Sequence, residues 1–207
     1  MRRVLPVLLA LGLSACAVSS GQQATGFSDP RVGAAYLPLR ASVFLGERRG
    51  AAVVIAKNVA VSNAHNANLL DPKTVIGTSK SYDLLFFHTD SQAVPPQFGQ
   101  PRMGETVLAY GEGKGGDLRV AHGTITALEA PVEPICAACG PQSAFTFAGD
   151  AGEGFSGGPV VDAVDGRVIG IVFGFTEGKT RTIYAYSMRR VSTELQGVEN
   201  RLPADPD

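Results

Sequence analysis

Short runs of apolar and β-branched residues, separated by glycine, asparagine and charged residues, recur along the chain from residue 40 onward. Such runs at short spacing are typical of antiparallel strands joined by hairpins. The first predicted strands cover residues 41–45, 51–56, 59–62, 74–78 and 84–87, and a second series covers 105–110, 118–128, 144–148, 159–164, 168–175 and 180–188. Only residues 189–197 have helical spacing, with Val191 and Leu195 four positions apart.

Residues 91–100, which contain Pro95 and Pro96, predict a linker between these two series. Two groups of about six strands indicate an all-β fold of two packed six-stranded antiparallel β-barrels, followed by a short C-terminal helix. We therefore expect a first barrel over residues 39–95 and a second over residues 96–191. Residues 192–207 are expected to form the C-terminal helix and tail.

The N-terminal residues follow a different pattern. Arg2 and Arg3 precede a short apolar run that is too short to span a bilayer, which predicts a removed signal peptide over residues 1–15. The Leu-Ser-Ala-Cys sequence that ends at Cys16 resembles the bacterial lipobox, which implies that Cys16 is lipidated. An ordinary secretory signal with a chance cysteine is the alternative.

A lipidated Cys16 would anchor the chain in the bacterial cell envelope, because several acyl chains together bind a membrane stably. Ala17 follows the cysteine, a pattern that resembles outer-membrane sorting, so we expect a periplasmic protein at the outer rather than the inner membrane. Residues 16–38 are polar and rich in glycine and serine, which predicts a flexible tether.

Composition narrows the class of protein. The chain of 207 residues is 44% hydrophobic and 18% charged, which excludes a disordered protein. Its 18 basic and 19 acidic side chains argue against a nucleic-acid partner bound through a basic face. Cys136 and Cys139 form a CxxC pair that could be a structural disulfide, a redox site or half of a metal site. The surrounding prolines and glycines favour a disulfide in a loop, and we expect no metal and no cofactor.

Three short segments carry candidate chemistry, and each is weak by itself. His65 follows an apolar strand and could act as a general base near neutral pH. Asp83 precedes an apolar strand and could orient a histidine. Ser156 lies between glycines, which would leave its hydroxyl exposed beside backbone N–H donors.

In the order His65, Asp83, Ser156, these segments together resemble the trypsin-like (chymotrypsin-fold) serine peptidases of the compact bacterial type. The strand that ends in Ala-His, the Asp-Leu-Leu sequence at Asp83 and the Gly-Phe-Ser-Gly-Gly-Pro sequence at residues 154–159 carry this resemblance, which extends over residues 39–191. It implies that Ser156 is the nucleophile, His65 the base and Asp83 its partner. The N–H groups of Gly154 and Ser156 would form the oxyanion hole.

The resemblance also implies how a protein or peptide substrate binds. The main chain of Phe173, Gly174 and Phe175 would pair with an extended peptide. Asp150 lies six residues before Ser156, where trypsin has the acid that selects Arg or Lys, although it could equally be a turn residue. The implied function is a serine endopeptidase in the cell envelope. A lipoprotein of the same fold that binds extended peptides or envelope proteins without cutting them is the alternative.

Two features depart from the family pattern. Asp83 follows His65 by only 18 residues, and Asp71 and Asp90 are rival partners for the histidine. Phe155 occupies the position where the digestive enzymes have an aspartate that pairs with a new N-terminus. That ion pair cannot form here, so we expect a constitutively ordered site or another form of control.

Overall fold

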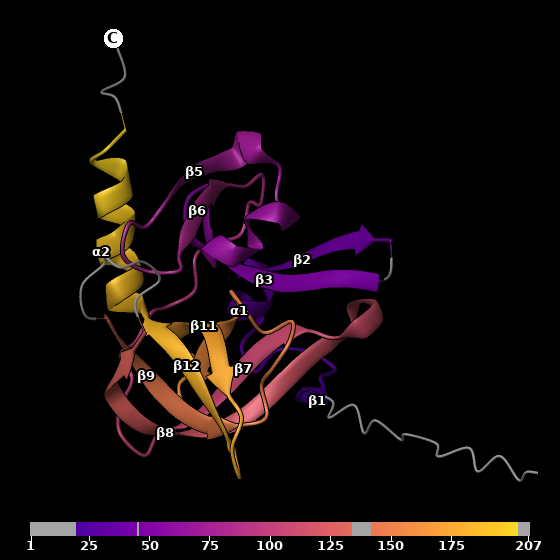
Figure 1. Ribbon diagram of the computed structural model, residues 1–207, viewed down its shortest axis with the longest axis vertical. Coiled ribbons are helices and arrows are strands. Elements are labelled where there is room, and N and C mark those ends of the chain that lie inside the picture. Colours follow the sequence, from indigo (N-terminus) through magenta and orange to yellow (C-terminus); the bar gives the residue numbers. More distant parts are fainter. Residues whose placement is uncertain (1–19, 45, 134–141, 203–207) are drawn as a thin grey trace, which may run out of the picture.

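The computed structural model describes residues 20–44, 46–133 and 142–202. In its second half, six antiparallel strands close into a barrel in the order β8-β7-β10-β11-β12-β9, because β9 also pairs with β8 (Figure 1). These strands are β7 (Thr106–Glu112), β8 (Leu118–Val132), β9 (Gln142–Gly149), β10 (Pro159–Asp162), β11 (Val168–Thr176) and β12 (Arg181–Ser187). The all-β prediction and the prediction of this barrel are confirmed.

The first half is a five-stranded sheet in the order β2-β3-β4-β6-β5. Its strands are β2 (Tyr36–Val43), β3 (Gly46–Ala56), β4 (Val59–Ser62), β5 (Val75–Thr78) and β6 (Leu85–His88). The edge strands β2 and β5 do not pair with each other in the described chain, so the prediction of a closed six-stranded first barrel is wrong. One face of this sheet packs against the second half and the C-terminal helix, and the alternate positions of its strands form a separate buried cluster on the other face.

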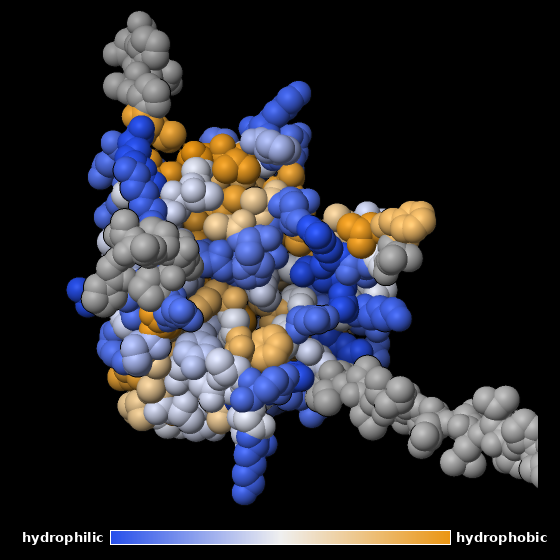
Figure 2. Space-filling view, viewed as in Figure 1, coloured by the Kyte–Doolittle hydropathy of each residue, from blue (hydrophilic) through white to orange (hydrophobic). Residues whose placement is uncertain are grey.

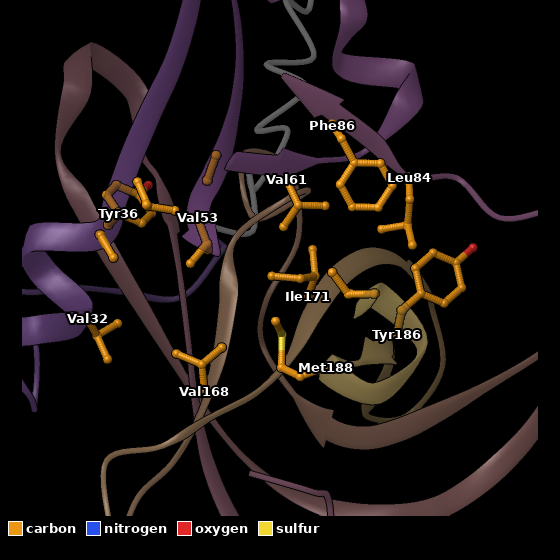
Figure 3. Packing of buried hydrophobic residues seen from close by; sticks show 14 of the residues in the cluster. Val32, Tyr36, Val53, Val61, Leu84, Phe86, Val168, Ile171, Tyr186 and Met188 are labelled. Atoms are coloured by element: carbon orange, nitrogen blue, oxygen red, sulfur yellow. The ribbon is translucent and has the colours of Figure 1, made fainter. Parts of the chain in front are cut away.

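A shared core joins the two halves. Val53, Val61 and Phe86 of the open sheet face Ile171 and other apolar side chains of the barrel, and all belong to one buried cluster (Figure 3). Burying these side chains stabilises each half only when the other is present, since the hydrophobic contribution follows the area removed from water. The halves therefore hold a fixed relative position, which a site between them requires.

Residues 20–38 differ from the expected flexible tether over residues 16–38. Strand β1 (Gln22–Gln23) pairs with β8, and helix α1 (Pro30–Ala35) begins at Asp29, whose carboxylate accepts the Arg31 N–H at 2.8 Å. The side chains of Val32 and Ala35 are fully buried in the shared core. Because most residues of the segment are polar, the sequence pattern did not reveal that Val32 and Ala35 are core residues. The described part of the segment is packed against the rest of the domain.

Helix α2 (Met188–Glu199) returns from the barrel to the open sheet (Figure 1). It begins where the Ser187 hydroxyl accepts the Arg190 N–H, and its position agrees with the predicted helix. At the far side, the Ser79 hydroxyl donates to Glu194 at 2.7 Å and the Arg201 guanidinium donates to the Thr78 carbonyl at 2.8 Å. The helix therefore fixes the open sheet to the barrel.

The hairpin of β2 and β3 projects beyond the shared core. Its tip forms an orange apolar patch on the surface in Figure 2, where Val43 and Phe44 are exposed. Strand β3 extends back to Gly46, so residues 46–50, which separate two of the predicted strands, belong to this hairpin. The tip adds nothing to the core, and burial begins at Gly50.

Candidate active site

The end of β4 and the beginning of β6 bring His65 and Asp83 together. Ser62 pairs with Leu85 in the sheet, so the residues that follow β4 lie beside those that precede β6. His65 lies in the short 3-10 helix η1 (Ala64–Leu69), with its Nδ1 2.6 Å from Asp83 Oδ2. Asp83 Oδ1 accepts the His65 backbone N–H at 3.0 Å. One carboxylate therefore holds both the ring and the backbone of the histidine.

This contact gives the imidazole a defined orientation. A carboxylate that accepts from Nδ1 holds the proton on that nitrogen, and leaves Nε2 as the acceptor. The rival Asp71 has another role, because its carboxylate accepts the Lys73 N–H at 3.0 Å at the beginning of helix η2 (Pro72–Thr74), and the described contacts of His65 Nδ1 include Asp83 and not Asp90. The partner of His65 in the structure is Asp83.

Ser156 lies in the second of two consecutive tight turns. The Phe155 N–H donates to the Gly152 carbonyl at 3.1 Å, and the Gly158 N–H donates to the Phe155 carbonyl at 2.9 Å. The third residues of these turns, Gly154 and Gly157, have φ angles of 87° and 83°, which a residue with a side chain rarely adopts. A Cβ at Gly154 would also collide with the Glu112 carbonyl. Glycine is therefore required on both sides of the serine.

The backbone of Ser156 is bound to the histidine side of the site. Its carbonyl accepts the Ala51 N–H at 2.8 Å and the Asn66 side-chain amide at 3.1 Å. Asn66 also donates to the Ser62 hydroxyl, which in turn donates to the Ala51 carbonyl at 2.7 Å. Sequence reasoning missed this network, and its only signal was that Asn66 directly follows His65.

His65 and Ser156 line the same cavity of about 370 Å³. The charged residues in its wall are Glu47, Arg48, Arg49 and Glu153, with an Arg49 nitrogen 4.0 Å from a Glu153 oxygen. The remaining lining residues are Asn66, Asn68, Leu69 and Gly154. The base, its candidate nucleophile and one of the predicted oxyanion donors thus open onto one space.

Two backbone donors beside this cavity have no protein acceptor in the described ranges, namely the N–H groups of Gly154 and Ser156. By contrast, the N–H groups of Phe155, Gly157 and Gly158 all donate to backbone carbonyls of the protein. Two N–H groups that have one residue between them can together bind an oxygen that acquires negative charge. The arrangement can therefore stabilise a tetrahedral intermediate.

Strand β11 contains the predicted peptide-binding residues. Its pairing with β10 ends at Ile171, whereas its pairing with β12 continues to Thr176. One edge of Phe173–Phe175 therefore lacks a paired strand of the barrel within the described residues.

The Phe173 ring stacks on Tyr186 at 4.0 Å between centroids. Burial raises the pKa of the Tyr186 hydroxyl, which accepts the Asp83 N–H at 3.4 Å.

Asp150 lies in the loop after β9, apart from the residues that line the Ser156 cavity. Its carbonyl accepts the Gly21 N–H at 2.9 Å and a guanidinium N–H of Arg181 at 3.4 Å. Cys16, Cys136 and Cys139 lie outside the described residues, so lipidation and the disulfide stay predictions.

The described residues offer neither a cluster of metal-binding side chains nor a membrane-spanning helix. They contain no group of three or more His, Cys, Asp or Glu side chains placed to hold a metal ion. Among the described helices, none combines the length and the apolar character needed to cross a membrane.

The model of one protein family, described as the trypsin-like peptidase domain, matches residues 31–171. Among solved structures, the active form of the Rv3671c protease from M. tuberculosis has a TM-score of 0.69 and 21% identity, covering 98% of this chain and 97% of that one. The HtrA-type protease AlgW with a decapeptide has a TM-score of 0.66 and 18% identity, covering 83% of this chain and 66% of that one.

The MamO protease domain from Magnetospirillum magneticum, in its apo form, has a TM-score of 0.62 and 16% identity, covering 79% of this chain and 96% of that one. At such identities these likenesses concern the fold. No curated protein matches the chain.

Proposed function

The chain belongs to the trypsin-like peptidase domain family, and on this basis we propose that it is a serine endopeptidase that uses Ser156, His65 and Asp83. The observation that carries the proposal is the single cavity onto which both the Asp83-bound His65 and Ser156 open. A cavity of this kind lets one reacting carbonyl contact the nucleophile and remain within reach of the base.

The proposed reaction follows from these positions. His65 Nε2 takes the Ser156 hydroxyl proton as the oxygen attacks the scissile carbonyl, and Asp83 stabilises the imidazolium. The N–H groups of Gly154 and Ser156 bind the oxyanion. His65 then gives the proton to the leaving amine, which leaves an acyl group on Ser156. A water molecule, deprotonated by His65, hydrolyses that ester and restores the free serine.

We propose that the substrate is a protein or peptide that binds as an additional strand along Phe173, Gly174 and Phe175, whose open edge supports this mode of binding. Asp150 stays a candidate selector of Arg or Lys before the cleaved bond. If it has that role, cleavage after Arg or Lys dominates a proteomic profile, and Asp150→Ser removes the bias. A profile dominated by small apolar residues would instead identify Asp150 as a turn residue.

A serine-directed fluorophosphonate probe tests the central proposal. We expect the wild-type protein to be labelled and Ser156→Ala not to be labelled, because only the activated hydroxyl reacts with the probe. Equal thermal unfolding of the two proteins is the control. A folded wild-type protein that takes no label would support the alternative, a lipoprotein that binds extended peptides or envelope proteins without cutting them.

We propose further that Cys16 is lipidated and holds the domain in the cell envelope, facing the periplasm. Ser20 is already docked, so residues 17–19 are the only chain between the anchor and the domain. Four residue steps reach at most about 14 Å, which would hold the active site near the membrane surface. Metabolic labelling with an alkyne fatty acid tests this, since Cys16→Ser should take no label and should leave the membrane fraction.

Cys136 and Cys139 are proposed to form a disulfide in the same compartment. Alkylation of the exported protein before and after reduction tests this pairing. We expect two thiols to appear only after reduction in the wild-type protein. We expect Cys136→Ser to leave proteolysis unchanged and to show no thiol-exchange activity, two results that together would exclude a redox role.

A further inference from the structure

Residues 20–23, here called the N-terminal segment, lie against residues 150–156, the loop that contains Ser156 and is here called the serine loop. The Gly21 N–H donates to the Asp150 carbonyl at 2.9 Å, and Arg181 reaches the Ser20 hydroxyl at 3.5 Å. Strand β1 pairs with β8, and Arg119 donates to the Gly21 carbonyl at 3.4 Å. The contacts come from the serine loop on one side and the barrel on the other.

Phe155 links this segment to the catalytic serine. Its side chain is fully buried, and its ring lies between Gly111 of β7 and Gly21 of the N-terminal segment. A Cβ placed on Gly21 would lie 2.7 Å from Phe155 Cζ, so the ring occupies the space that a side chain there would need. The φ angle of Gly21 is +63°, which also favours glycine.

The buried Phe155 ring belongs to the residue between the two unpaired donors of the serine loop. Phe155 lies between Gly154 and Ser156, whose N–H groups have no protein acceptor in the described chain. The direction of these donors follows from the conformation of the serine loop, which its two turns and the bonds to the Ser156 carbonyl hold in part. The ring, bounded by the N-terminal segment, and the Gly21–Asp150 hydrogen bond supply further support from both ends of the loop.

We propose that the N-terminal segment is a positioning element of the active site, which holds the serine loop so that Gly154 and Ser156 direct their N–H groups at the reacting carbonyl. This inference rests on the proposed peptidase function. It assigns a catalytic contribution to residues that precede the family match, which begins at residue 31. It also accounts for an ordered serine loop in which Phe155 takes the place of an acidic residue.

The test compares Gly21→Val with Gly26→Val. A Cβ at Gly26 would contact nothing within 4 Å, so this variant is a matched control in the same stretch of chain. We expect Gly21→Val to lower kcat by at least about tenfold with KM nearly unchanged, within the roughly 10²–10³-fold that loss of one oxyanion donor costs. Gly26→Val should keep wild-type values. Both values of kcat are corrected for the folded fraction by thermal unfolding.

A second measurement separates positioning from a loss of stability. A peptide with the wild-type sequence of residues 20–25, added at about millimolar concentration to Gly21→Val, should restore part of kcat, whereas a scrambled peptide should not. Hydrogen exchange of the serine-loop amides should be faster in Gly21→Val than in Gly26→Val. Both results are expected if the segment positions the loop.

The proposal is overturned if Gly21→Val keeps the wild-type kcat after correction, or if the serine loop exchanges at equal rates in the two variants. A wild-type protein that takes no fluorophosphonate label would contradict the proposed function instead. The exchange comparison still decides the positioning role in that case, because it needs no turnover.

Discussion

The contact between Asp83 and His65 makes Asp83→Asn the most direct test of the proposed mechanism. In the structure Asp83 Oδ1 accepts the His65 backbone N–H at 3.0 Å, and Oδ2 lies 2.6 Å from Nδ1. An asparagine oxygen can keep the first of these bonds. Its NH₂ group then faces Nδ1, which must become an acceptor, so the ring proton moves to Nε2. The base loses the lone pair that should accept the Ser156 proton.

The expected magnitude follows from this change of tautomer. Geometry is preserved while the base is blocked, a change that costs about 10⁴-fold in kcat in a Ser-His-Asp triad. Four factors of ten correspond to about 5 kcal/mol of lost transition-state stabilisation at 25 °C. The free energy of unfolding should change little, because the substitution keeps the side-chain volume and one of its two hydrogen bonds.

Two measurements check this prediction: the rate constant for fluorophosphonate labelling and kcat/KM on a peptide substrate. Asp71→Asn and Asp90→Asn are the controls, since the carboxylate bound to His65 in the structure is that of Asp83. Both controls should keep wild-type rates. Wild-type labelling by Asp83→Asn, or an equal loss in either control, would refute the assignment of Asp83.

Three further predictions concern stability. Phe155→Ala removes a fully buried ring and should lower the free energy of unfolding by about 3–5 kcal/mol in urea titrations, and a change below about 1 kcal/mol would contradict its packing role. Ser79→Ala removes a 2.7 Å bond to Glu194 and should cost about 1.5–3 kcal/mol, measured by thermal unfolding; equal stability would mean that this contact does not hold α2. Burial raises the pKa of Glu112 above its usual 4.5, so the folded state holds that proton more tightly and the wild-type free energy of unfolding should fall as pH rises from about 4.5. Glu112→Gln should lack this decline, and parallel stability–pH profiles of the wild-type and variant proteins would exclude Glu112 as its cause.

Local sequence patterns predicted most strands because buried apolar segments alternate with polar turn segments along the chain. The range predicted for β4, residues 59–62, agrees with the structure, and Pro159 begins both the predicted strand and β10. The placement of His65 beside Asp83 also follows from local order, since His65 follows β4 closely and Asp83 precedes β6, the neighbour of β4 in the sheet. Patterns of this kind depend only on residues near one another in the chain.

The features that the pattern missed depend on contacts between distant residues. The segment around Gly21 resembled a tether because its own residues are polar, and its partners, Asp150 and Phe155, lie about 130 positions away in the sequence. Closure of a sheet likewise depends on whether its two edge strands pair, and the sequence of a single strand does not contain this information. Asn66 was missed because its partner is the carbonyl of Ser156 rather than a side chain.

The division of the site between the two halves has a consequence for the time at which activity arises. The base and its carboxylate belong to the open sheet, whereas Ser156 belongs to the barrel, which closes only when β12 has been added. Helix α2 then returns to the open sheet through Glu194. Chains are synthesised from the N-terminus, so a partly made chain has a histidine without its nucleophile. Under the proposed function, the chain gains activity only after its last strand and helix have been made, so its own unfolded segments are not cleaved during synthesis.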